Sequence, residues 1–198
     1  MEFRSGVDDA WYAVKIYTED NSAERLTVKF CNFEDEYDEV YEAKDLTSAN
    51  HMTNFLSRFR LVSIQVQDSE CPNVVEGMLV CAAVSVTPDN CRFYDAVVNR
   101  VKCKKHRSVE GEEECLCKFV LFWKHWPKGG SLTTQAVRDI CRVQPRTEEV
   151  DPLLALFLQT TRSRIQTNES SLVPLATSST VPHEASSKGI REKWSERD

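Results

Sequence analysis

Short segments rich in β-branched and aromatic residues recur along this chain, and they limit its possible folds more than any other feature. The first two span residues 11–17 and 25–30, and the turn-forming residues Asp20, Asn21 and Ser22 lie between them. Alternating apolar and polar positions are typical of half-buried strands, so this pair predicts a hairpin. Five more strand-like segments follow, at residues 39–43, 60–66, 77–86, 93–102 and 116–123. The series predicts a mostly β protein made of small barrels or sandwiches.

The strand-like segments fall into two groups that are separated by polar residues around Asp68. We therefore predict a first lobe at residues 1–68 and a second lobe, built on a similar plan, at residues 69–166. From about residue 167 onward Ser, Thr and Pro dominate. Such a composition is too poor in apolar residues to form a core, so residues 167–198 are predicted to be a disordered tail.

Helix is predicted mainly at the end of the second lobe. Asp151 is a good N-cap residue, Pro152 suits the first helical position, and apolar residues recur at helical spacing up to Gln159. This short C-terminal helix needs a barrel surface on which to pack its apolar stripe. We also expect helix at residues 134–141, and a short helix or a long loop at residues 51–60.

Acidic residues are concentrated at the start of the chain. Residues 1–50 contain 13 Asp and Glu against 5 Lys and Arg, a net charge of −8, whereas the whole chain carries −6. Such a field repels phosphate backbones and attracts basic polypeptides, although a merely solvated acidic face is the alternative. The longest apolar run, Met78 to Val84, is too short to span a membrane, and the first residues lack an apolar leader. We therefore expect a reducing compartment.

Eight cysteines in such a compartment need an explanation other than disulfides, and six of them lie, with His106, between Cys71 and Cys117. Cys115 and Cys117 are two residues apart on a predicted strand, so both thiols point to one face and can bind one metal ion. If the strands on either side of His106 form a hairpin, the imidazole faces this pair across the open loop.

The fourth metal ligand follows from the register of the preceding hairpin. In a hairpin centred near residue 88, partner residues sum to about 175, which places Cys71 near His106 and Cys81 much further along the strand. We therefore predict a closed, tetrahedral zinc site of Cys71, His106, Cys115 and Cys117, with Cys81 and Cys141 as reserve ligands. Ordinary buried or reactive cysteines and a catalytic metal are the alternatives.

Three aromatic residues of the first lobe, Tyr12, Phe30 and Phe33, lie near chain turns and close to a run of acidic residues. Aromatic faces around a methylated ammonium bind it by cation–π attraction, and nearby carboxylates add charge. Core packing is the alternative, because Phe30 continues the inward phase of Leu26 and Val28.

With these motifs the sequence resembles the SAWADEE domain of plant chromatin proteins over residues 2–145. The likeness is carried by a series of short motifs in the family's order: Glu2-Phe3-Arg4, Trp11-Tyr12, residues 28–37, residues 69–71, residues 77–81, Phe93-Tyr94-Asp95-Ala96, His106, Cys115-Leu116-Cys117 and Ile140-Cys141-Arg142. The resemblance implies a tandem Tudor-like fold of two small β-barrels, with a zinc ion in the second lobe. It also implies that Tyr12, Phe30 and Phe33 form a cage for methyl-lysine.

The resemblance further implies contacts with a methylated histone tail. Glu2 matches an acidic residue that holds a nearby unmethylated lysine, and Val80 and Phe93 match residues of the second lobe that touch the tail. Ala13 departs from the family, in which we expect Asp. The family's role implies a nuclear protein of RNA-directed DNA methylation or related silencing, with silencing-complex proteins as further partners. No homeodomain is recognisable, so direct DNA contact is not expected.

A binding module is therefore the preferred function. The alternative is a zinc-stabilised scaffold that recruits silencing partners without reading methyl-lysine. An enzyme has the least support, because no nucleophile elbow, phosphate loop or carboxylate pair beside a histidine occurs in the sequence, and a closed zinc site offers no open coordination position.

Overall fold

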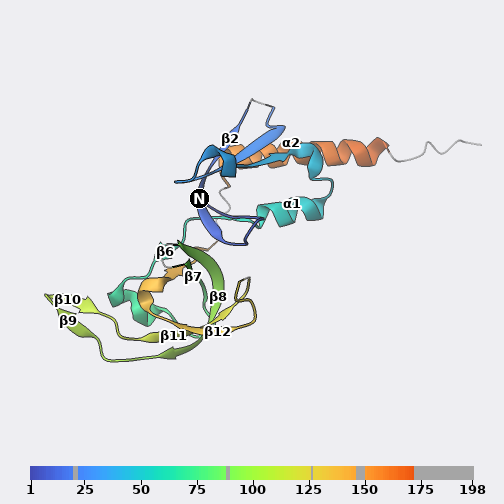
Figure 1. The fold of residues 1–198 in the computed structure, drawn as a ribbon. Coiled ribbons are helices and arrows are strands. Elements are labelled where there is room, and N and C mark those ends of the chain that lie inside the picture. Colours follow the sequence, from blue (N-terminus) through green and yellow to red (C-terminus); the bar gives the residue numbers. More distant parts are fainter. Residues whose placement is uncertain (20–21, 88–89, 126, 146–149, 172–198) are drawn as a thin grey trace, which may run out of the picture.

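The computed structural model describes residues 1–19, 22–87, 90–125, 127–145 and 150–171. It has two lobes, one of which carries both α-helices while the other carries the long strands and a projecting ribbon (Figure 1). No helix of the described residues is long and apolar enough to cross a bilayer.

The first lobe is a small antiparallel sheet covered by two helices. Its elements are β1 (Glu2–Arg4), β2 (Trp11–Thr18), β3 (Arg25–Phe30), the 3-10 turn η1 (Asp35–Tyr37), β4 (Glu39–Glu42), η2 (Ala43–Asp45), α1 (Ala49–Leu56), β5 (Phe59–Arg60) and α2 (Pro152–Ser171). β2 and β3 form the expected hairpin, with Val14 opposite Phe30. Ser48 caps α1 by accepting a hydrogen bond from the His51 N–H at 3.2 Å.

The second lobe is built around one long hairpin. Its elements are β6 (Ile64–Gln65), η3 (Asp68–Asn73), β7 (Leu79–Thr87), β8 (Asn90–Lys102), β9 (Arg107–Val109), β10 (Glu112–Glu114), β11 (Lys118–Trp123), β12 (Leu132–Gln135), η4 (Val137–Asp139) and β13 (Ile140–Arg142). β6 pairs with β13 of this lobe, although we assigned its residues to the first lobe. The boundary near Asp68 stays a prediction.

The mostly β class is confirmed, but the described strands do not close into barrels. Eleven of them form one sheet whose main path runs β4-β3-β2-β8-β7-β13-β6, with β1, β5, β11 and β12 paired beside it, and β9 and β10 form a separate two-stranded ribbon. The two lobes share this sheet through a single antiparallel pair, Trp11 opposite Phe93. The predicted small barrels are therefore open sheets, which meet where β2, already paired with β1 and β3, also contacts β8, already paired with β7 and β11.

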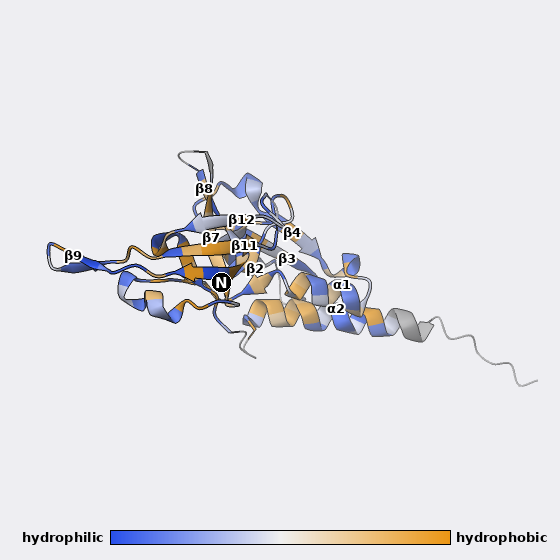
Figure 2. Ribbon diagram, turned by 90° about the horizontal axis from the view of Figure 1, so that it is seen from below, coloured by the Kyte–Doolittle hydropathy of each residue, from blue (hydrophilic) through white to orange (hydrophobic). Residues whose placement is uncertain are grey.

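Two hydrophobic cores lie on either side of this junction. The first contains Phe3, Leu26, Val28, Phe55 and Phe157, and the second contains Tyr94, Phe119, Leu121, Trp123 and Ile140. Figure 2 shows hydrophobic residues along β7 and along one side of α2, whereas the β9–β10 ribbon is largely hydrophilic.

The C-terminal helix is confirmed, but its place in the fold differs from our prediction. Asp151 accepts hydrogen bonds from the N–H groups of Leu153 and Leu154, as an N-cap residue does. Phe157 packs against Phe55 of α1 with a centroid distance of 5.7 Å, so α2 belongs to the first core. The helix continues to Ser171, past the start of the predicted tail, and residues 172–198 lie outside the described residues.

The helix predicted at residues 134–141 was wrong. This segment contains the end of β12, the turn η4 and most of β13. Thr134 pairs with Val120 of β11, and Cys141 pairs with Cys81 of β7. Strand pairing with two distant segments outweighs a local helical pattern here, as tertiary context commonly outweighs propensity.

Candidate metal centre and aromatic cluster

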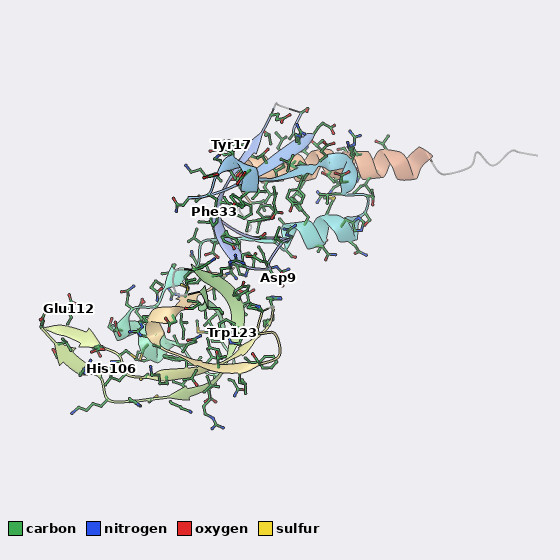
Figure 3. The ribbon with its side chains drawn as sticks, viewed as in Figure 1. Asp9, Tyr17, Phe33, His106, Glu112 and Trp123 are labelled. Atoms are coloured by element: carbon green, nitrogen blue, oxygen red, sulfur yellow. The ribbon has the colours of Figure 1, made fainter. Side chains whose placement is uncertain are left out.

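The four predicted metal ligands converge in the second lobe. Their ligand atoms all lie within 4.8 Å of one another. His106 Nε2 lies 3.2 Å from the Cys71 sulfur and 3.6 Å from the Cys117 sulfur. The register explains the convergence, because β8 and β11 pair up to Lys102 and Lys118 and so bring His106 beside the cysteine pair. Figure 3 shows His106 near the base of the β9–β10 ribbon.

The reserve ligands lie elsewhere. Cys81 and Cys141 face each other across β7 and β13 and pack with Trp11 at the lobe junction. All eight cysteines are free thiols in this structure. The prediction that Cys71 rather than Cys81 joins the cluster therefore agrees with the arrangement of the strands.

Hydrogen bonds around the cluster suit a thiolate–metal site. The Lys104 N–H points at the Cys117 sulfur at 3.3 Å, and the Asp68 carboxylate accepts a bond from the Cys115 N–H at 2.7 Å. Although burial raises it, the bonds from Lys104 and His106 lower the pKa of Cys117 to about 7. Nδ1 of His106 bonds the Glu113 carboxylate, which leaves Nε2 for a metal ion.

Three sulfurs and one imidazole nitrogen are a suitable ligand set for a metal ion with tetrahedral coordination. Zinc binds sulfur at about 2.3 Å and nitrogen at about 2.0–2.1 Å, which places neighbouring ligand atoms a little under 4 Å apart. His106 Nε2 lies 3.2 and 3.6 Å from two of the sulfurs, near that spacing, and all four ligand atoms lie within 4.8 Å of one another. The three thiols are buried. A set of four protein ligands fills the coordination sphere, so the cluster can hold a structural metal ion.

The three aromatic residues singled out in the first lobe also come together. Tyr12 lies on β2, Phe30 ends β3, and Phe33 follows it in the turn before η1. The ring of Tyr12 is 5.4 Å from that of Phe30 and 5.5 Å from that of Phe33, with interplanar angles of 88° and 89°. Phe30 and Phe33 are 6.2 Å apart at 72°. The three rings are therefore nearly perpendicular to one another.

Phe33 is 47% exposed, whereas Phe30 is 6% exposed and belongs to the first core. The cluster thus combines a buried ring with one open to solvent, and Figure 3 shows Phe33 on the surface of the first lobe. A fourth ring, Tyr37, lies 6.0 Å from Phe33 and was not predicted to join the cluster. Its position four residues after Phe33, within the acidic run, is the signal that could have identified it.

Carboxylates surround this aromatic cluster. Asp35 and Asp38 both pair with Lys29, while Glu34 and Glu36 are exposed beside them. On the opposite side, the Tyr12 hydroxyl donates a hydrogen bond to Asp8 at 2.6 Å. The cluster is therefore an aromatic surface within an acidic field, which attracts a cation.

Glu2 is held at the lobe junction. Its carboxylate accepts hydrogen bonds from Arg60 at 2.7 Å and from the Ser63 N–H at 2.9 Å. Arg60 also donates to Asp95 at 2.7 Å, and its guanidinium carbon lies 3.6 Å from the centroid of the Trp11 ring. No role for Arg60 or Asp95 was predicted, although a charged residue between apolar strand residues was the available signal. A tail contact by Glu2 stays a prediction, and it would have to share the carboxylate with Arg60.

The two tail contacts expected in the second lobe differ in accessibility. Val80 is 0% exposed and lies in β7 between β8 and β13, so its side chain belongs to the core, and a tail contact at this position stays a prediction. Phe93 is half-buried and packs at the junction with Trp11. Of this pair, Phe93 alone presents side-chain surface near the first lobe.

Comparisons with known proteins agree with these features. A family model, described as the SAWADEE domain, matches residues 1–141. A selenium-substituted mutant of the SAWADEE domain of Arabidopsis thaliana SHH1 is similar with a TM-score of 0.52 and 22% sequence identity. The SHH1 SAWADEE domain in complex with an H3K9me3 peptide is similar with a TM-score of 0.52 and 25% identity. Both alignments cover 73% of this chain and 96% of the other. No curated protein matches the chain.

Proposed function

Because this chain belongs to the SAWADEE domain family, we propose that it binds a histone tail carrying a methylated lysine, and that Tyr12, Phe30 and Phe33 form the cage for the methylammonium group. The observation that carries this proposal is the arrangement of the three rings, which are mutually near-perpendicular and 5.4–6.2 Å apart. A related domain, that of SHH1, has been crystallised with an H3K9me3 peptide.

The ring spacing suits a methylated ammonium. If the three faces point toward a common corner, centres this far apart share a point about 4 Å from each centre, inside the ~6 Å range of cation–π attraction. A cation at that point would face three rings at once. Because Phe33 is half-exposed, the ligand can enter from solvent without opening the core.

Charge supports a basic ligand. The first 50 residues carry a net charge of −8, and Glu34 and Glu36 are exposed next to Phe33. This field would speed the association of a Lys- and Arg-rich tail and would weaken as salt is added.

Phe33→Ala provides the test of the cage. We expect its affinity for an H3K9me3 peptide to fall about tenfold or more, because one exposed wall of the cage and its cation–π attraction are lost. Its affinity for the unmodified peptide should stay at the wild-type value. Fluorescence polarisation or calorimetry with both peptides measures the two dissociation constants.

Phe122→Ala is the matched control, since Phe122 is 43% exposed but lies on β11 of the second lobe. It should bind both peptides as the wild type does. Equal affinity of the wild-type protein for methylated and unmodified peptides would overturn the cage, and binding of silencing proteins without any peptide binding would then favour the scaffold function.

We further propose that the ion in the second lobe is Zn²⁺ and that it is structural. Zinc is the common metal of closed Cys₃His sites, and its role there is to join segments that have little core of their own. The cluster joins η3, the connection between β8 and β9, and the residues just before β11.

Together with the proposed binding of a methylated histone tail, we propose that the protein is a binding module of the nucleus that acts in RNA-directed DNA methylation or related silencing.

A further inference from the structure

Asp8 connects the aromatic cluster to the second lobe. Its Oδ2 atom accepts a hydrogen bond from the Tyr12 hydroxyl at 2.6 Å and another from Arg92 Nη1 at 2.6 Å. Its second oxygen accepts a bond from the Ala10 N–H at 3.1 Å, which holds the carboxylate in place from its own loop. Three of the roughly four acceptor positions of the Asp8 carboxylate are therefore used within the protein.

The hydroxyl is the far end of the Tyr12 ring, so its hydrogen bond determines how the ring is tilted. Tyr12 is only partly buried, and it packs against both hydrophobic cores. Apolar contacts are not directional, whereas a hydrogen bond of 2.6 Å is. Burial and the bond to Asp8 raise the pKa of Tyr12, so the hydroxyl keeps its proton and remains a donor.

Arg92 brings the second lobe into this arrangement. It lies on β8 next to Phe93, whose pairing with Trp11 is the strand contact between the lobes. The side chains of Asp8 and Arg92 are 11% and 29% exposed, so the ion pair is shielded from solvent for most of its surface. Arg92 of the second lobe thus holds the Asp8 carboxylate, which in turn orients the Tyr12 ring of the first lobe.

We propose that Asp8 and Arg92 are positioning residues for methyl-lysine recognition, which hold the Tyr12 ring perpendicular to Phe30 and Phe33. This inference rests on the proposed function, because it concerns the same cage. It adds that the cage is completed by the second lobe, so that recognition of the methyl group depends on how the two lobes are joined.

The test is a double-mutant cycle between Asp8→Ala and Tyr12→Phe. Each variant removes one partner of the hydrogen bond, and Tyr12→Phe keeps the ring itself. For each variant the dissociation constants for H3K9me3 and unmodified peptides are measured, and their ratio reports on the cage. We expect each single variant to reduce this ratio about three- to tenfold, and the double variant to reduce it no further than the larger single effect.

If Asp8 has a merely structural role, Asp8→Ala should weaken the binding of both peptides equally or lower the thermal midpoint of unfolding. The ratio of the two dissociation constants should then stay unchanged. Arg92→Gln is a second variant that leaves the Asp8 loop and the rings intact, and it should reduce the ratio in the same direction. Asp45→Ala, an exposed aspartate of the first lobe, is the control and should behave as the wild type does.

The outcomes separate the two proposals. A wild-type protein without methyl preference overturns the cage and this inference together. A wild-type protein with methyl preference, combined with an unchanged ratio in Asp8→Ala and Arg92→Gln or with additive effects in the double variant, overturns the positioning role alone.

Discussion

Removing the metal ion should unfold the second lobe. Structural zinc contributes an apparent binding free energy of about 10–16 kcal/mol in zinc-finger peptides, as much as or more than the whole stability of an ordinary domain. Addition of a strong chelator, or Cys115→Ser, should therefore abolish amide-exchange protection in β8 and β11, while β2 and β3 keep more of theirs. Among the described residues, one strand pair, Trp11 with Phe93, and the ion pairs of Arg60 with Asp95 and of Arg92 with Asp8 join the lobes, so unfolding of the second lobe need not spread at once to the first.

Cys103→Ser is the matched control for this experiment. Cys103 is an exposed free thiol close in sequence to His106 and outside the ligand cluster. The Cys103→Ser variant should retain one zinc ion per chain, as measured by elemental analysis, and the wild-type thermal midpoint, as measured by scanning calorimetry. Full stability of Cys115→Ser, or of the chelated wild type, would show that the cluster is a group of ordinary buried thiols.

Arg60→Met should destabilise the protein by about 3–5 kcal/mol, the usual cost of removing one partner from a buried ion pair. The Arg60 side chain is 7% exposed, and it pairs with Glu2 and Asp95, whose side chains are 13% and 9% exposed. Without the guanidinium, two buried carboxylates from different lobes face each other uncompensated. Denaturant unfolding, monitored by tryptophan fluorescence, measures the loss.

Two further variants identify its cause. The triple variant Glu2→Gln, Arg60→Met, Asp95→Asn should recover part of the lost stability, because it leaves no unpaired buried charge. Arg100→Met, at an exposed arginine of the same strand as Asp95, should change stability by less than about 0.5 kcal/mol. A loss as large in the triple variant as in Arg60→Met would instead assign the effect to lost packing on Trp11.

Much of the local structure followed from the sequence. The hairpin of β2 and β3 was predictable because alternating residues, with turn formers between them, specify both strands and their connection. The candidate metal cluster was predictable because Cys115 and Cys117 are two residues apart, although they lie between β10 and β11 rather than within a strand, and because hairpin register brings Cys71 and His106 to the same end. In each case the relevant contacts lie within one hairpin or between hairpins that follow each other.

The remaining features needed contacts between distant segments. The sequence could not show that α2 would return to the first lobe, that residues 134–141 would pair as strands, or that the sheet would continue from β2 into β8. Nor could the sequence decide whether Tyr12, Phe30 and Phe33 form a methyl-lysine cage or pack in the hydrophobic core, because the same aromatic residues occur in both.

The sequence by itself determined the strand-rich class, the four residues of the candidate metal cluster and the acidity of the first lobe, because residue type and short-range spacing are sufficient for each of these. Only the tertiary structure decided how the lobes join, that Arg60 lies between Glu2 and Asp95, and that the Tyr12 hydroxyl meets Asp8 and Arg92. These contacts depend on the directions in which side chains leave separate strands, and those directions are established only when both cores have packed.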